Sequence, residues 1–123
     1  MKKILIVDDN QGVTDPCQRF LKKRGYKVIA VATKTDAKNE LTSNDFDLVI
    51  VDCTIGLYMG ENLLEEIKKE KPNAGIIVIS GYFSNERIKD CIDSGAYHCI
   101  DKPFEFNEVL NSVIGFFRKQ EKK

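Results

Sequence analysis

Residues 3–9 read KILIVDD, a continuous apolar run that ends at two adjacent aspartates. A run without polar alternation is typical of a strand that is covered on both faces, as in a parallel sheet between helices. Two similar runs follow, LVIVD at residues 48–52 and IIVIS at residues 76–80. The three runs predict the central strands of a parallel sheet, and their polar ends indicate where functional side chains lie.

Two weaker apolar runs, Val28–Val31 and Tyr97–Ile100, complete a set of five. Amphipathic stretches with capping signals separate the runs and predict helices. The expected helices are one from an N-cap at Asp15, with Pro16 in its first turn, to Gly25; one over Asp36–Thr42; one over Glu61–Lys71, stopped by Pro72; one from a cap at Ser84 to Gly95; and a last one from Phe106 to Phe117. Strands and helices are therefore expected to alternate.

This alternation predicts one α/β domain over residues 1–123. Right-handed crossovers then allow a (βα)5 doubly wound parallel sheet in three layers. Because the first, third and fourth runs are the most apolar, they should be central. This favours the flavodoxin-like strand order 2-1-3-4-5.

The last helix carries apolar residues at helical spacing that are expected to face the core: Phe106, Val109, Leu110, Val113, Ile114 and Phe117. Gly115 lies within it, where glycine costs about 1 kcal/mol relative to alanine. Two interpretations are open, fraying of the helix or close packing against a partner, and fraying is preferred.

Composition excludes several classes of protein. Lys and Arg number 19, as do Asp and Glu, so the net charge is zero and there is no basic field for nucleic acid. The apolar segments are too short for a signal peptide or for a membrane span of roughly 20 residues. The sequence therefore predicts a cytoplasmic protein that binds neither nucleic acid directly nor a membrane.

The four cysteines, Cys17, Cys53, Cys91 and Cys99, show no CxxC spacing, and His98 is the only histidine. Reduced structural thiols are favoured over a disulfide framework or a zinc site. His98 is interpreted as a residue of the surface or of a strand end.

Five polar side chains follow four of the predicted strands: Asp8, Asp9, Asp52, Ser80 and Lys102. Because ligands of an open parallel sheet bind outside the carboxyl ends of its strands, these side chains should meet in one pocket. Two carboxylates about 4 Å apart repel by roughly 4 kcal/mol at an effective dielectric near 20, and a divalent cation relieves that repulsion. Oxygen ligands favour Mg²⁺, which takes one or two carboxylates and gains further oxygens from water and phosphate.

Asp52 stands alone at the end of a central strand and is placed to act as a carboxylate nucleophile on phosphorus. Lys102 supplies a positive charge and Ser80 a hydroxyl donor for phosphoryl oxygens. A double aspartate or a Lys-Pro dipeptide is often only part of a turn. Their joint placement at four strand ends favours a site for phosphoryl transfer.

With these residues the chain resembles a receiver domain of a two-component response regulator over almost its whole length. The resemblance implies that Asp52 is the phosphoacceptor and a ligand of Mg²⁺. It further implies that Asp9 binds the metal directly, that Asp8 binds it through water, and that the backbone carbonyl of Thr54 is the remaining protein ligand.

Ser80 and Lys102 match the serine or threonine and the lysine that assist catalysis in the family. Residues 102–104 match its Lys-Pro-Phe motif, in which the Lys-Pro peptide is often cis. Such domains take a phosphoryl group from a histidine kinase or phosphotransfer protein and then change their surface around the last strand. The resemblance thus implies a signalling phosphoacceptor that catalyses only its own phosphorylation and dephosphorylation. It would act on a downstream effector protein or a fused output domain, and homodimerisation is left open.

Three features depart from the family pattern. Ile55-Gly56 replaces a common Met-Pro, which should leave the loop after the acceptor less rigid. Cys99 stands three positions before the lysine, where an aromatic residue is usual, so a ring-based switch is not expected. Residues 57–59 make the loop apolar, for which core packing is preferred over a docking patch. We also expect Tyr82 to hinder hydrolytic water.

A receiver-like scaffold that binds partners without phosphoryl control is the main alternative, supported by Cys99 and the altered loop. A flavodoxin-type cofactor carrier is disfavoured because Asp8 and Asp9 would repel its phosphate. A phosphatase with an aspartate nucleophile would need a second acid where Thr54 stands.

Overall fold

The computed structural model describes residues 1–55, 62–81 and 84–121. Within these ranges five strands alternate with five helices: β1 Lys3–Val7, α1 Gln11–Lys23, β2 Lys27–Val31, α2 Lys34–Ser43, β3 Leu48–Asp52, α3 Leu63–Glu70, β4 Gly75–Ser80, α4 Asn85–Asp93, β5 His98–Asp101 and α5 Phe106–Glu121. All strand pairs are parallel, in the order β2-β1-β3-β4-β5. The predicted fold class and strand order are confirmed.

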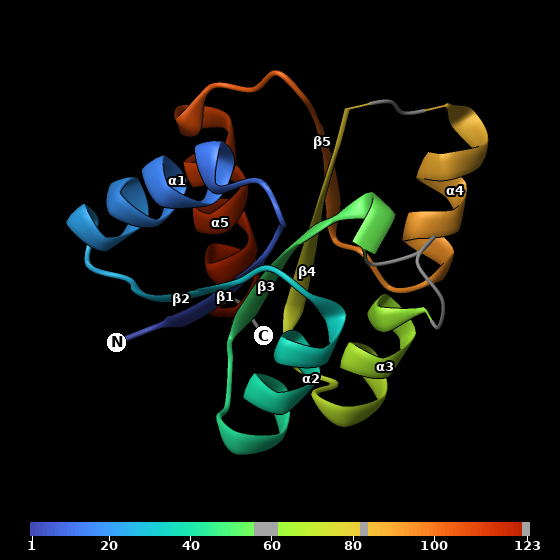
Figure 1. The fold of residues 1–123 in the computed structure, drawn as a ribbon, viewed down its shortest axis with the longest axis horizontal. Helices are drawn as coiled ribbons and strands as arrows, with labels where there is room; N and C mark the ends of the chain where they lie inside the picture. The colour runs from blue at the N-terminus through green and yellow to red at the C-terminus, as the bar shows by residue number, and fades with distance from the viewer. Residues whose placement is uncertain (56–61, 82–83, 122–123) are drawn as a thin grey trace.

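The sheet lies between two layers of helices, with α1 and α5 on one face and α2, α3 and α4 on the other (Figure 1). Side chains of the central strands alternate between the two faces. On β1, Leu5 and Val7 pack under α2, α3 and α4, whereas Ile4 and Ile6 pack under α1 and α5. Both faces of the central strands are therefore buried, which is why their sequences are continuously apolar.

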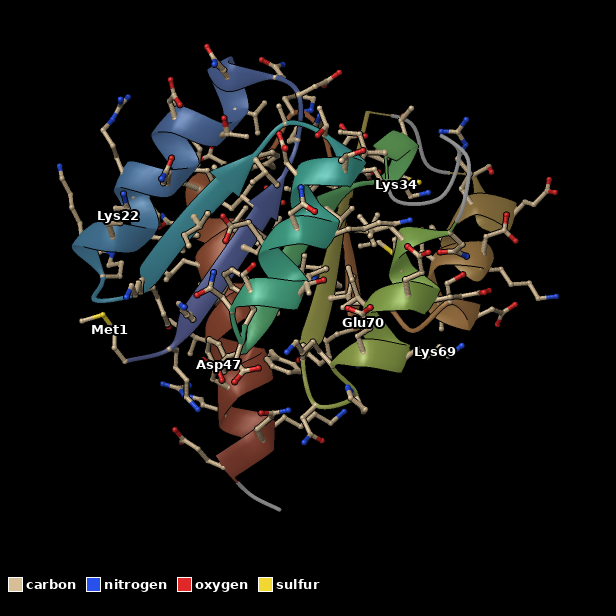
Figure 2. The ribbon with its side chains drawn as sticks, turned by 60° about the horizontal axis from the view of Figure 1, so that its bottom comes forward. Met1, Lys22, Lys34, Asp47, Lys69 and Glu70 are labelled. Atoms are coloured by element: carbon tan, nitrogen blue, oxygen red, sulfur yellow. The ribbon has the colours of Figure 1, made fainter. Side chains whose placement is uncertain are left out.

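Charged side chains occupy the outer faces of the helices. Lys22 of α1 and Lys69 and Glu70 of α3 are exposed, and the side chains of Lys22 and Lys69 project outward (Figure 2). No described helix combines the length and the apolar character that crossing a lipid bilayer requires.

The predicted start of the first helix is wrong. α1 begins at Gln11, and its N-cap is Asn10, whose side-chain oxygen accepts a hydrogen bond from the Gly12 N–H at 2.9 Å. Pro16 therefore lies within the helix, where it removes one main-chain hydrogen bond. The helix end is as predicted, because Gly25 adopts a φ of 93°, which favours glycine.

The other helices agree more closely with expectation. Ser84 caps α4, and Gly95 follows it with a φ of 107°. α2 extends the predicted range at both ends. α3 begins at Leu63, two residues later than predicted, because Asn62 is its N-cap, and it buries Leu63, Leu64 and Ile67 as expected. On α4, by contrast, Ile88 and Ile92 are 41% and 48% exposed.

α5 differs from its prediction in two respects. It continues to Glu121, so fraying at Gly115 is the wrong interpretation. A Cβ placed on Gly115 would lie 3.4 Å from the hydroxyl oxygen of Tyr97, the residue directly before β5. Gly115 therefore packs against the side chain of Tyr97. Phe116 is buried although it lies outside the predicted apolar pattern, because Gly75 lacks a side chain and leaves room for the ring.

Several sequence-based expectations concern residues outside the described ranges. They are the loop flexibility at Gly56, the apolar residues 57–59 and the role of Tyr82. They stay predictions.

Candidate functional site

The register of β1 and β3 brings the first two predicted site residues together. Val7 pairs with Val51, so Asp8 and Asp52 lie side by side where the two strands end. A slip by one residue would turn every side chain of a strand to the opposite face and disrupt the packing of both cores, so this register is strongly specified.

The register of β4 and β5 places the next two residues at the same edge. Ser80 pairs with Asp101, and the Lys102 N–H donates a hydrogen bond to the Ser80 carbonyl oxygen at 2.7 Å. The peptide bond between Lys102 and Pro103 is cis, as the motif led us to expect. Lys102 therefore leaves the sheet directly beside the ends of the central strands.

Lys102 joins the strand ends through one ammonium group. Its Nζ donates to Asp52 Oδ2 at 2.9 Å and to Asp8 Oδ2 at 3.3 Å. Burial acts to lower the pKa of Lys102, but the hydrogen bond and charge of Asp52 and the charge of Asp8 outweigh it, so the pKa is raised. The ammonium thus stays charged at neutral pH and compensates two carboxylates.

Asp8 is the most enclosed acid of the site, with 4% of its surface exposed. Its Oδ1 accepts a hydrogen bond from the Asn10 N–H at 2.9 Å. Burial nevertheless raises the pKa of Asp8, and the nearby charge of Asp52 adds to that effect, although Asn10 and Lys102 oppose it. The ionised form of Asp8 is therefore present at a cost in folding free energy.

Two hydrogen bonds orient the carboxylate of Asp52, and its side chain is still partly exposed to solvent. Its Oδ1 accepts a hydrogen bond from the Thr54 N–H at 2.8 Å, while Oδ2 accepts from Lys102. The side chain is 14% exposed. A small reactant can therefore approach a carboxylate whose orientation is already defined.

The remaining predicted residues lie at the same edge. Thr54 donates its N–H to Asp52, and the carbonyl oxygen of Ser80 accepts from the Lys102 N–H. Asp9 and Thr54 are exposed, and Ser80 is 4% exposed. In the part of the chain that the structure describes, no three carboxylate, imidazole or thiol groups are placed to hold a metal ion together. The structure thus brings together Asp8, Asp52 and Lys102, and it leaves Asp9 exposed.

The donors fit a hard divalent cation in kind, because they are carboxylate oxygens. Asp8 and Asp52 already direct one oxygen each at the same positive group, and exposed Asp9 adjoins them. Mg²⁺ takes one or two carboxylates and keeps several of its waters, so it does not need a closed cage of protein ligands.

Asn10 is the site residue that sequence reasoning missed. It orients Asp8 through its N–H and caps α1 through its side chain. Asparagine is among the favoured N-cap residues, so its place directly after the aspartate pair was a usable signal.

Replacement of Asp8 by Asn tests the cost of the buried charge. A raised pKa means that the contribution of Asp8 to stability is fully present below its ordinary value of 3.8 and is lost as pH rises through the raised value. Asp8→Asn is therefore expected to stabilise the fold at pH 7 by about 1 kcal/mol, or roughly 3–5 °C in the unfolding midpoint. The gain should vanish in acid.

Thermal unfolding followed by circular dichroism measures this effect. Asp45→Asn is the matched control, because the hydrogen bond and charge of Lys71 lower the pKa of the exposed Asp45 carboxyl. The control should not raise the midpoint at pH 7. A lower midpoint for Asp8→Asn than for the unsubstituted protein would contradict the interpretation.

Comparison with known protein families matches almost the whole chain to one family. Residues 4–114 match the response regulator receiver domain. Among curated proteins, the response regulator SaeR of Staphylococcus aureus (strain USA300) is 27% identical over 122 residues, which cover 99% of this chain and 53% of that protein. The chain therefore spans about half the length of the curated relatives it matches.

Solved structures agree with this assignment. A CheY-like response regulator receiver domain protein from Methanospirillum hungatei JF-1 has a TM-score of 0.91 at 30% identity, with 99% of this chain and 98% of that chain covered. A response regulator protein from Burkholderia pseudomallei has a TM-score of 0.84 at 26% identity, with 99% and 72% covered. It was crystallised with a phosphorylated aspartic acid, a calcium ion and citrate.

Proposed function

The chain belongs to the response regulator receiver domain family, and we propose that Asp52 accepts a phosphoryl group from a histidine kinase or a phosphotransfer protein. One observation carries this proposal: Asp52 is the carboxylate that is both held by Lys102 and partly open to solvent. Asp8 is held by the same lysine but is enclosed. The two acids therefore differ in the property that a nucleophile needs.

In the proposed reaction an oxygen of Asp52 attacks the phosphorus atom of the donor. A new O–P bond forms, the bond between phosphorus and the donor's leaving atom breaks, and the leaving atom keeps that electron pair. Asp52 becomes an acyl phosphate. The transition state spreads negative charge over the phosphoryl oxygens, so positioning and electrostatic stabilisation supply most of the catalysis.

Lys102 and Ser80 have separate roles in this scheme. When Asp52 is phosphorylated, the Lys102 ammonium releases its hydrogen bond to the carboxylate oxygen of Asp52 and donates to a phosphoryl oxygen instead. It keeps its hydrogen bond to Asp8. The Ser80 hydroxyl donates a hydrogen bond to another phosphoryl oxygen. Neither group loses a proton, which accords with the raised pKa of Lys102.

Bound Mg²⁺ would supply further positive charge to the phosphoryl oxygens. In our proposal Asp9, Asp52 and the backbone carbonyl of Thr54 would hold the ion directly, and Asp8 would hold it through water. The structure of the relative from Burkholderia pseudomallei contains both a phosphorylated aspartic acid and a calcium ion, which supports a divalent cation in this proposal.

Addition of Mg²⁺ is expected to raise the unfolding midpoint of the unphosphorylated protein. A ligand that binds only the native state adds about 2.7 kcal/mol at a hundred times its dissociation constant. Thermal unfolding in increasing Mg²⁺ measures the shift, which Asp9→Asn should reduce and Asp45→Asn should leave intact. A midpoint that does not respond to Mg²⁺ would refute the metal site while leaving the fold assignment unaffected.

The proposed output is a change of surface that a partner reads. The partner is a downstream effector protein or a fused output domain, and the greater length of the curated relatives supports the second. Family membership also supports a cytoplasmic location for the reaction. A homodimer remains compatible with the proposal.

Incubation of the protein with Mg²⁺ and a small phosphodonor tests the function. Uptake of one phosphoryl group, measured by intact mass, is expected. No adduct with saturating donor would favour the alternative, a receiver-like scaffold that binds partners without phosphoryl control.

A further inference from the structure

An apolar groove lies beside the proposed phosphorylation site, where the start of α1 faces the segment between β5 and α5 (Figure 1). The groove has a volume of about 420 Å³ and is lined by six residues: Gly12, Val13, Lys102, Pro103, Phe104 and Phe106. Val13, Phe104 and Phe106 are only partly buried, so some of their apolar surface remains open to solvent. The groove can therefore take an apolar group from solution.

Aromatic packing holds the wall of the groove in place. The rings of Phe104 and Phe106 meet edge to face with centroids 5.9 Å apart, and Phe106 stacks on Phe20 of α1 with centroids 5.6 Å apart. Phe104 and Phe106 also pack against the core beneath α1 and α5. Aromatic pairs in these arrangements attract each other beyond the area that they bury. The groove is thus formed in the free protein, and a ligand needs to order little on binding.

Lys102 connects the groove to the carboxylate of Asp52. Its side chain lines the groove, and its Nζ donates to Asp52 Oδ2 at 2.9 Å. One residue therefore borders both the apolar surface and the place where the phosphoryl oxygens of a donor would meet an ammonium group. A donor that joins an anionic phosphoryl group to an apolar body matches both parts at once. A donor whose remainder is a single methyl group does not fill the groove.

We propose that the groove is a donor subsite, which gives Asp52 a preference for acyl phosphates with an aromatic acyl group over acetyl phosphate. This inference rests on the proposed phosphorylation of Asp52. Binding of the ring removes its apolar surface, and that of Val13 and Phe104, from water. Because the same contacts hold the phosphoryl group beside Asp52, they raise the rate at which dilute donor reacts.

The transfer itself keeps the chemistry proposed for Asp52. A carboxylate oxygen of Asp52 attacks phosphorus, the bond between phosphorus and the acyl oxygen breaks, and the aromatic carboxylate leaves with that electron pair. No proton needs to move, because the leaving carboxylate is a stable anion at neutral pH. Both donors yield the same phosphorylated Asp52, so the groove changes only how well the donor is held.

The test compares benzoyl phosphate with acetyl phosphate as donors to the unsubstituted chain in the presence of Mg²⁺. Intact mass follows the rate of phosphoryl uptake at donor concentrations below saturation. The rates at which the two donors hydrolyse in buffer alone give the baseline for their intrinsic reactivity. We expect a preference for benzoyl phosphate of about tenfold beyond that baseline, since even one methylene group in an apolar pocket is worth roughly 10–200-fold in specificity.

Two variants assign the preference to the groove. Val13→Thr keeps the shape of the side chain and replaces one methyl group by a hydroxyl, so it should lower the preference by about threefold. Ile92→Thr is the matched control, because Ile92 is 48% exposed on α4, in the helix layer on the other face of the sheet (Figure 1). The control should leave the rates with both donors unchanged.

A pair of ligands that cannot react tests the groove without phosphoryl transfer. Benzylphosphonate and methylphosphonate carry an anionic phosphorus group on a P–C bond, which such a transfer does not break. Benzylphosphonate should shift the NMR signals of the Val13 methyl groups, because its ring would lie against them in the groove. Methylphosphonate at the same concentration should leave those signals in place.

The outcomes separate the donor subsite from the proposed function. Uptake from acetyl phosphate without a preference for benzoyl phosphate, or a preference that Val13→Thr leaves intact, overturns the subsite while phosphorylation of Asp52 stands. No uptake from either donor counts against the proposed function, and the Val13 signals then decide on the groove by themselves. Val13 signals that do not respond to benzylphosphonate overturn the subsite in either case.

Discussion

Asp52→Asn is expected to abolish phosphoryl uptake from a small phosphodonor in the presence of Mg²⁺. The substitution keeps the shape of the side chain and the oxygen that accepts from the Thr54 N–H, but it removes the anionic oxygen that attacks phosphorus. An amide oxygen is a far weaker nucleophile. The measurement is the intact mass of the protein after incubation, in which the variant should show no adduct.

Asp101→Asn is the matched control for this experiment. Asp101 lies at the carboxyl end of β5, at the same edge of the sheet, and is exposed. Its replacement should leave uptake intact. A persistent adduct on Asp52→Asn would move the acceptor to another side chain, of which Asp8 is the nearest carboxylate that shares Lys102.

Lys102→Met is expected to slow phosphorylation of Asp52 by about a hundredfold. Removal of one group that stabilises developing negative charge typically costs a factor of 10²–10³. Methionine keeps much of the length of the lysine stem, so the change isolates the ammonium group. Rates of phosphoryl uptake at saturating donor, followed by mass, measure the effect.

The same substitution has a second consequence that the ion pairs predict. Asp8 and Asp52 then face each other without a cation, so the variant should be less stable at neutral pH and should gain more stability from Mg²⁺ than the unsubstituted protein does. The sign follows from the raised pKa of Lys102. Its contribution is fully present below the ordinary value of 10.5 and is lost only above the raised value.

Lys71→Met is the control for the loss of a lysine. Lys71 makes an ion pair with Asp45, which is 95% exposed; both residues precede their strands, β4 and β3, and so lie at the edge of the sheet opposite the site. Such surface pairs contribute little, so phosphorylation should proceed at the unsubstituted rate. Equal rates for Lys102→Met and Lys71→Met would exclude the proposed role of Lys102.

Local patterns predicted the helices unevenly, and the errors have a common cause. A proline was taken as a first-turn residue, but Asn10 offers a better cap further upstream, and packing of α1 on the sheet tolerates the missing hydrogen bond at Pro16. Phe116 fell outside the apolar stripe, yet it is buried because Gly75, on another element, leaves space for its ring. In both cases a distant or competing contact outweighed the local signal.

Three things follow from the amino-acid order alone: the strands, their succession in the sheet, and the edge at which the polar residues gather. Continuously apolar runs need cover on both faces, and parallel strands bring all their carboxyl ends to one side. Which of these side chains touch one another depends on tertiary packing, which no local sequence pattern encodes. Asp8 and Asp52 share one ammonium group because Lys102, which is 94 positions from Asp8 and 50 positions from Asp52 in the chain, meets both at the edge of the sheet. The Sγ atoms of Cys53 and Cys91 are likewise brought within 3.9 Å of each other by the packing of α4 on the sheet.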